Sequence, residues 1–163
     1  MQGVNFAEIE KDFVRARVFA DFQWRAYDTF SPLNPLRVPL QSARIAFVTT
    51  CGAHLTDQAP FDIRAPVGDP SFRAFPSLTP LQEIELTHRG YDTRHAGADK
   101  NVVLPLDHLR AAASEGRIGA LTPTVHSFMG YIADIQPLLE ETAPEVAARL
   151  ASDGADLVLL APT

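Results

Sequence analysis

The sequence contains a single cysteine, Cys51, in 163 residues. One cysteine permits no internal disulfide and no cysteine-rich zinc or iron–sulfur site, so the fold must depend on its hydrophobic core. The sequence also lacks a run of the roughly 18 to 20 apolar residues that a membrane-spanning helix needs. Its N-terminus lacks the basic segment followed by an apolar one that marks a secretory signal. We therefore expect a cytoplasmic protein without a membrane partner.

Basic residues are few: 14 Lys and Arg stand against 20 Asp and Glu, for a net charge of −6. Because phosphate binding requires clustered basic residues, we expect no nucleic-acid partner. Four common motifs are absent as well, namely G-x-G-x-x-G, the P-loop, G-x-S-x-G and H-E-x-x-H. Their absence argues against dinucleotide oxidoreductases, nucleotidases, serine hydrolases and zinc proteases. We predict no metal and no cofactor within the chain.

The first thirty residues place aromatic and aliphatic residues at helical spacing, with charges between them. We predict a helix whose apolar stripe packs on the domain or on a second copy in a homo-oligomer; the alternative is a ligand-binding aromatic face. Three prolines in residues 31–39 predict an extended connector. The predicted organisation is an N-terminal helix with a Pro-rich connector over residues 1–40 and an α/β domain over residues 41–163.

Strand-like and helix-like segments alternate from residue 44 onward. The apolar runs at 44–50 and 155–162 suit buried strands, and Pro105 begins a helix that continues to Ala113. The other predictions are short strands at 72–75, 83–88, 101–104 and 114–120, a loop at 122–127, and helices at 128–139 and 144–154. This alternation predicts a Rossmann-like α/β fold: a parallel sheet with flanking helices in three layers and right-handed crossovers.

Polar or reactive side chains follow the first predicted strand. Ligands collect beyond the carboxyl ends of parallel strands, so Thr50 and Gly52 are predicted to bind substrate. Cys51 lies between them, beside backbone N–H groups that lower the pKa of a thiol, and is a candidate nucleophile. The alternative is a buried cysteine that acts as a small apolar side chain.

The segment HRGYDTRH, residues 88–95, combines imidazole, carboxylate and guanidinium groups. These groups suffice to bind a small carboxylate or to transfer a proton. We therefore predict His88 and Asp92 as catalytic residues, with Gly90 and Tyr91 as substrate-binding neighbours. The alternative is a polar surface loop whose Asp and Gly form turns.

His126 lies in TVHSFMG, between a predicted strand and a predicted helix. It is either a core residue with satisfied hydrogen bonds or a second acid–base group at the sheet edge. Ser127, next to it, is a further predicted substrate-binding residue. A metal site at 88–95 is disfavoured, because the two histidines there lack the i, i+4 spacing of helical zinc ligands.

Five strings occur in the order found in one known family: VTTCGAHL (48–55), LTHRGYD (86–92), DKNVVLPLDHLRAAASEGRIG (99–119), SFMG (127–130) and EETAPEVAARLASDGADLVLLAPT (140–163). The chain thereby resembles the selenoprotein B subunits of glycine, sarcosine, betaine and D-proline reductases, with the D-proline reductase group closest. Four residues match the family's H-G-G-[FY]-D string: His88, Gly90, Tyr91 and Asp92. Arg89 replaces a glycine of that string, and the family does not support a nucleophile at Cys51.

The resemblance implies reductive cleavage of a C–N bond in a small amino acid or betaine-type substrate. A selenol or thiol attacks the carbon next to the carboxylate, a thioredoxin-type donor supplies electrons, and a pyruvoyl group on a partner subunit activates the amine in D-proline reductase. The family's selenocysteine or cysteine follows the strand that matches 155–163, in a U-x-x-C or C-x-x-C arrangement whose second thiol releases the product.

The resemblance therefore implies a nucleophile beyond Thr163, and we expect the 163-residue chain alone to be inactive. One explanation is an in-frame selenocysteine codon after Thr163 that has been read as a stop. The other is a short family member in which Cys51 supplies the thiol or the fold only binds. A non-catalytic module that binds a small molecule or dimerises is the alternative function.

Overall fold

The computed structural model describes residues 4–17, 20–23, 31–32, 34–91 and 94–163. The chain divides into two compact units, residues 1–35 and 36–163, and each is described by itself. In the smaller unit α1 (Phe6–Arg17) is amphipathic, with Phe6, Ile9 and Phe13 exposed. The helix that was predicted for the first thirty residues does not extend through residues 20–21, which form a turn. Residues 18–19 and 24–30 of that prediction lie outside the described residues.

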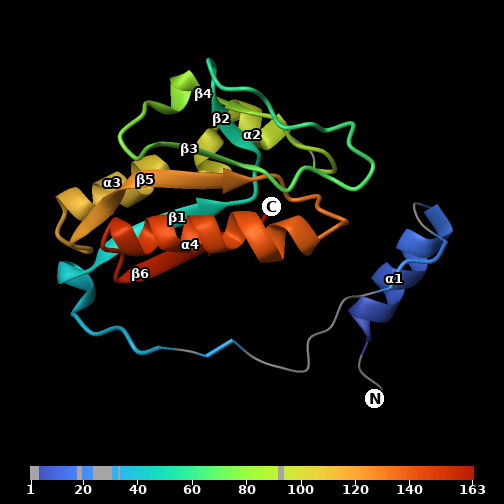
Figure 1. Ribbon diagram of the computed structural model, residues 1–163, viewed down its shortest axis with the longest axis horizontal. Helices are drawn as coiled ribbons and strands as arrows, with labels where there is room; N and C mark the ends of the chain where they lie inside the picture. Colours follow the sequence, from blue (N-terminus) through green and yellow to red (C-terminus); the bar gives the residue numbers. More distant parts are fainter. Residues whose placement is uncertain (1–3, 18–19, 24–30, 33, 92–93) are drawn as a thin grey trace. The chain divides into compact units, whose positions relative to one another are not determined.

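The larger unit is built on a four-stranded sheet in the order β3, β5, β1, β6 (Figure 1). β1 (Arg44–Thr49) lies between β5 (Ala120–Phe128) and β6 (Leu157–Ala161) and is parallel to both. β3 (Phe72–Pro76) pairs antiparallel with β5 at the edge. The predicted α/β fold is confirmed, and the sheet is mostly parallel with one antiparallel edge strand, a common variation of such sheets.

Two helices cover opposite faces of this sheet (Figure 1). α3 (Leu106–Ser114) precedes β5 and α4 (Ala143–Ser152) precedes β6. Because β5 and β6 flank β1 on opposite sides, right-handed crossovers carry the two helices to opposite faces. Alternate residues of β1 accordingly enter different cores: Phe47 packs in the cluster that contains the first residue of α3, and Val48 packs with Leu150 of α4.

β5 differs most from the sequence prediction. The predicted loop at 122–127 is strand; of the predicted helix at 128–139, Phe128 still belongs to β5, and helix begins only at residue 136. Pairing with strands on both sides holds this polar segment extended despite Thr122-Pro123-Thr124, whose composition favours a turn. Pro123 has no N–H to donate, and the β1–β5 register shifts beside it.

Two further predicted strands are also corrected. In the predicted strand at 114–120, Ser114 ends α3, residues 115–119 turn through Gly116, which has a φ of +69°, and only Ala120 belongs to β5. Residues 100–102 form a 3-10 helix instead of part of a strand at 101–104, because the Asp99 carboxylate accepts a 2.9 Å hydrogen bond from the N–H of Asn101. Such Asx capping competes with extended structure.

A small second sheet lies above the carboxyl ends of the large one in Figure 1. It pairs β2 (Ala53–Leu55) with β4 (Ile84–Leu86) in antiparallel fashion. The loop that follows β4 leads to the short helix α2 (Arg94–Ala98). This arrangement brings His88 over the end of the main sheet.

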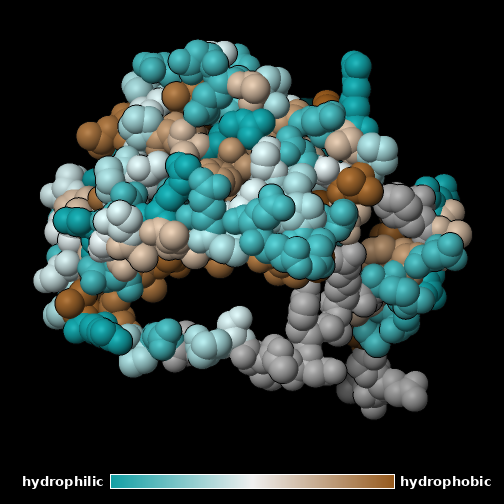
Figure 2. Space-filling model, viewed as in Figure 1, coloured by the Kyte–Doolittle hydropathy of each residue, from teal (hydrophilic) through white to brown (hydrophobic). Residues whose placement is uncertain are grey.

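β6 forms the other edge of the main sheet, and it is apolar and exposed. Leu157, Val158 and Leu159 each expose about 40% of their surface and Leu160 exposes 68%. Figure 2 shows apolar atoms along the lower edge of the larger unit, where Figure 1 draws β6. Edge strands in soluble proteins usually carry charged residues or proline, which prevent pairing with another chain, and β6 carries neither.

Candidate active site at the carboxyl end of the sheet

Three chain segments meet where the parallel strands end. The chain leaves β1 at Thr50, β5 at Met129 and β6 at Pro162. The backbone N–H of Thr163 donates a 2.8 Å hydrogen bond to the Thr50 hydroxyl, and Cys51 forms an isolated bridge with Met129. The carboxyl end of β6 therefore lies at the same site as the carboxyl end of β1.

A pocket of about 260 Å³ opens at this meeting point; its lining residues are His88, Arg89, Gly90, Tyr91, Gly130, Tyr131 and Thr163. The His88 ring joins the β4 loop to the β5 end, since its Nε2 accepts a 3.1 Å hydrogen bond from the N–H of Gly130. A Cβ at residue 130 would lie 2.6 Å from both His88 Nε2 and the Thr163 carbonyl oxygen. Glycine is thus required for this close approach.

His88 and Tyr91 form an interacting pair, with ring centroids 4.4 Å apart. Burial lowers the pKa of His88, so its ring is neutral near pH 7. Burial, together with the nearby Cys51 thiol, raises the pKa of Tyr91 to about 12. Because Nε2 of His88 accepts a hydrogen bond, its proton is assigned to Nδ1.

Neither His88 Nδ1 nor the Tyr91 hydroxyl has a hydrogen-bond partner among the described residues, although both atoms are buried. A buried donor without a partner is costly, and native structures contain few of them. Both donors belong to residues that line the same pocket. The pair is therefore suited to an acceptor such as the carboxylate of a small ligand.

Cys51 is fully buried in the core beside Phe47 and Phe75. Burial raises the pKa of its thiol and outweighs the hydrogen bonds that lower it, which involve the Thr49 side chain and the backbone of Ala53 and Cys51. A nucleophilic thiol needs an exposed environment that lowers its pKa, and Cys51 does not have one. The expectation is corrected: Cys51 has the environment of a buried, small apolar side chain. A catalytic role for Cys51 stays a prediction.

Three predicted substrate-binding residues, Thr50, Gly52 and Ser127, do not line the pocket but stabilise the backbone next to it. Thr50 binds the backbone of Thr163, and the buried Ser127 hydroxyl accepts a 2.8 Å hydrogen bond from the N–H of Ala53. Gly52 has a φ of +71°, and a Cβ there would lie 2.0 Å from the Thr87 carbonyl oxygen. These contacts fix the turn from β1 into β2.

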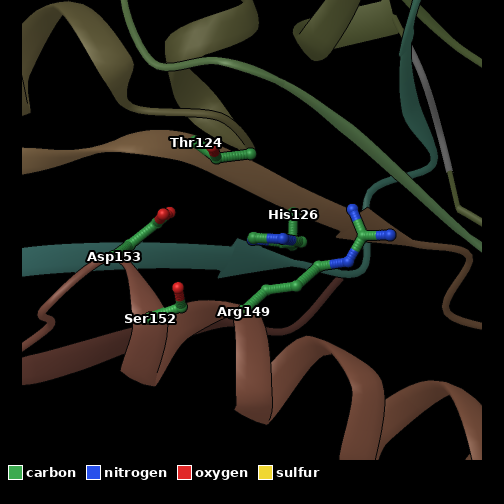
Figure 3. A pocket seen from close by; sticks show the side chains of 5 residues that line it. All are labelled: Thr124, His126, Arg149, Ser152 and Asp153. Atoms are coloured by element: carbon green, nitrogen blue, oxygen red, sulfur yellow. The ribbon is translucent and has the colours of Figure 1, made fainter.

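His126 lies away from His88, in a second hollow on the α4 face of β5 (Figure 3). Asp92 lies outside the described residues, so its predicted role has no structural counterpart here. Gly130 and Tyr131 were missed because residues 128–139 were predicted as a helix, which hid the true end of β5. Thr163 directly follows the predicted strand at 155–162, and that position alone could have marked it.

Within the described part of the chain, no group of three or more His, Cys, Asp or Glu residues is arranged to hold a metal ion. None of the helices described is long and apolar enough to span a membrane. The fold and the pocket define a class: an α/β domain with a pocket beyond the carboxyl ends of its parallel strands, the usual place for ligands in such sheets.

Comparison with known proteins specifies the family. Residues 16–163 match the family described as glycine/sarcosine/betaine reductase selenoprotein B. The chain belongs to this family, as its motifs predicted. No solved structure matches it.

Three relatives are similar to this chain. D-proline reductase subunit gamma of Acetoanaerobium sticklandii is 36% identical over 78% of the chain and 51% of that protein. Glycine reductase complex component B subunit gamma of Carboxydothermus hydrogenoformans is 31% identical over 85% of the chain and 32% of that protein. Betaine reductase complex component B subunit beta of Peptoclostridium acidaminophilum is 31% identical over 76% and 29%, respectively. The chain thus spans about half the length of the first relative and less of the others.

Proposed function

We propose that this chain is part of a selenol- or thiol-dependent reductase that cleaves a C–N bond of a small amino acid or betaine-type substrate, with its nucleophile beyond Thr163. Family membership supports the reaction class. The observation that carries the proposal is that Thr163 lines one pocket with His88 and Tyr91. A residue that follows Thr163 would emerge beside these two unpartnered donors.

In this proposal the substrate carboxylate accepts hydrogen bonds from His88 Nδ1–H and the Tyr91 hydroxyl. The selenolate or thiolate attacks the carbon next to the carboxylate; the C–N bond breaks, and the amine leaves with a proton. A second thiol then attacks the bound selenium or sulfur, the carbon takes up a proton, and a selenylsulfide or disulfide forms. A thioredoxin-type donor returns two electrons to that bond.

The partners of the proposed enzyme follow from its relatives. Two of them are named as components of reductase complexes, so we expect this chain to assemble with other subunits. A pyruvoyl group on such a subunit would supply activation of the substrate amine. The residues of this chain would bind the carboxylate and exclude water from the carbon that is attacked.

The gene beyond the codon for Thr163 provides the first test. An in-frame UGA followed by a cysteine codon in a U-x-x-C arrangement, with the reading frame continuing, would support the proposal. A UAA or UAG codon with no continuing frame would contradict it and leave a non-catalytic binding or dimerising module. Turnover of D-proline, glycine or betaine with dithiothreitol by the purified 163-residue chain would also contradict it.

The donor pair is tested in the extended protein with its partner subunits. Tyr91→Phe removes an unpartnered hydroxyl, and we expect kcat/KM to fall about tenfold or more, as for a lost hydrogen bond to a charged group. Tyr131→Phe is the matched control, because Tyr131 lines the same pocket but its hydroxyl already has a partner, the Pro66 carbonyl oxygen, to which it donates at 3.2 Å. Equal losses in both variants would contradict the assigned role of Tyr91.

A further inference from the structure

A second hollow, of about 180 Å³, lies between β5 and α4 (Figure 3). Its lining residues are Thr124, His126, Arg149, Ser152 and Asp153. It shares no residue with the pocket around Thr163. The hollow brings a guanidinium, a carboxylate, an imidazole and two hydroxyl groups together outside the proposed reductase site.

His126 is the unusual member of this group. It is 0% exposed, yet neither of its ring nitrogens has a hydrogen-bond partner among the described residues. Burial, and secondarily Arg149, lower its pKa while Asp153 opposes them, so the ring is neutral near pH 7. A neutral imidazole has one N–H donor and one acceptor nitrogen, and both are unsatisfied here. A polar occupant of the hollow would satisfy them.

The two charged side chains flank the ring. In Figure 3 the Arg149 guanidinium lies on one side of His126 and the Asp153 carboxylate on the other. Arg149 lies in the last turn of α4, and Asp153 is the C-cap residue of that helix; residues four positions apart on a helix have Cβ atoms about 5 to 6 Å apart. The C-terminal end of a helix also favours a cation near Asp153.

Arg149 is held in place by two other groups. Its Nη2 donates a 2.6 Å hydrogen bond to the Glu145 carboxylate, and its guanidinium carbon lies 5.1 Å from the centre of the Phe72 ring. An occupant's anionic group would therefore compete with one carboxylate for the guanidinium. The stacked position on Phe72 keeps the side chain beside the hollow.

We propose that this hollow binds a small zwitterion, with its anionic group on Arg149, its cationic group on Asp153, and His126 hydrogen-bonded between them. The opposite charges on the two sides of the ring select this class. A simple anion would meet the Asp153 carboxylate, and a simple cation would meet the guanidinium. The proposal goes beyond the proposed reductase function and does not depend on it.

The experiment titrates the protein with ω-amino acids of increasing length by calorimetry and by ¹⁵N NMR of the histidine rings. His126 signals are assigned by their absence from His126→Gln. We expect 4-aminobutanoate to bind and to shift the His126 ring signals. Butanoate and butylamine, which each carry one of the two charges, should bind at least about tenfold more weakly, the equivalent of about 1.4 kcal/mol.

Variants locate the binding. Arg149→Met and Asp153→Asn should each weaken 4-aminobutanoate about tenfold, since each removes one charged partner. Glu145→Gln should tighten it, because the guanidinium loses its competing carboxylate. Arg117→Met is the control, since Arg117 is an exposed arginine whose partner is Glu115.

Three results would overturn the proposal. The first is equal binding of butanoate or inorganic phosphate, which would mean an anion site only. The second is binding that survives both Arg149→Met and Asp153→Asn, which would assign the ligand to another pocket. The third is the absence of heat and of ring shifts with every member of the series. None of these results depends on reductase activity, so failure here leaves the proposed function standing.

Discussion

β1 and β6 are adjacent parallel strands with similar apolar sequences and opposite environments. Phe47 of β1 is 1% exposed, whereas its register partner Leu159 of β6 is 40% exposed. The same contrast holds for Val48 and Leu160, at 9% and 68%. β1 has a neighbour on each side and side chains packed on both faces, while β6 pairs only with β1 among the described strands. An apolar run in the sequence thus predicts a strand, but not whether that strand is central or lies at the edge of the sheet.

The largest effect should come from truncating paired residues of the two strands. Phe47→Ala opens a cavity in a closed core, and we expect it to lower the free energy of unfolding by about 3 to 5 kcal/mol. Leu159→Ala removes a side chain that is already partly in water, and its loss should be about 1 kcal/mol. Urea unfolding of the purified variants measures both values.

Phe47→Leu is a milder substitution that keeps the comparison measurable if Phe47→Ala does not fold. It should cost less than Phe47→Ala and preserve the unfolding slope of the parent protein. Equal losses for Phe47→Ala and Leu159→Ala would mean that β6 is covered in solution, and the contrast between the strands would then fail.

A smaller effect on stability is expected from a change of pH. His126 belongs to the buried part of the sheet, where it lies opposite Val48 in the β1–β5 register. Burial lowers the pKa of His126 in the folded chain, whereas the unfolded chain binds this proton near the ordinary value of 6.5. The unfolded state therefore binds more protons below about pH 6.5, and stability should fall as the pH drops toward the lowered folded pKa. One such proton contributes at most about 1.4 kcal/mol per pH unit.

Urea unfolding between about pH 7 and pH 5 measures this slope. His126→Gln should remove the contribution of His126 and leave that of His88, whose pKa is also lowered by burial. An unchanged slope in His126→Gln would show that His126 titrates alike in the folded and unfolded chains, contrary to its buried position.

The smallest effect on stability is expected at the exposed end of β6. Leu160→Lys introduces a charge at a position that is 68% exposed, and the free energy of unfolding should change by less than about 0.5 kcal/mol. The same charge should reduce self-association, because a lysine on an edge strand opposes edge-to-edge pairing. Analytical ultracentrifugation of both proteins measures the association. A large loss of stability would indicate that Leu160 is buried against another copy.

Some of the predicted site residues line the pocket, and others are buried in the core. His88, Gly90 and Tyr91 were predicted from dense polar residues after a strand, and all three line one pocket. Cys51 and Ser127 were predicted from their positions in sequence, but their side chains point into the interior and are buried. Residue type and strand ends therefore indicate the region of a site, while the direction of each side chain depends on packing.

The sequence by itself determined the α/β class, the strands β1 and β6, the helices α3 and α4, and the family. Those features follow from local hydrophobic periodicity, helix boundary signals and motif order, all of which are written along the chain. Only the tertiary structure decided that 120–128 is a strand, that β3 is antiparallel, and that His126 faces α4 while His88 faces Thr163. Strand pairing and burial are interactions between distant segments, and they overrode the local preference of Thr122-Pro123-Thr124 for a turn.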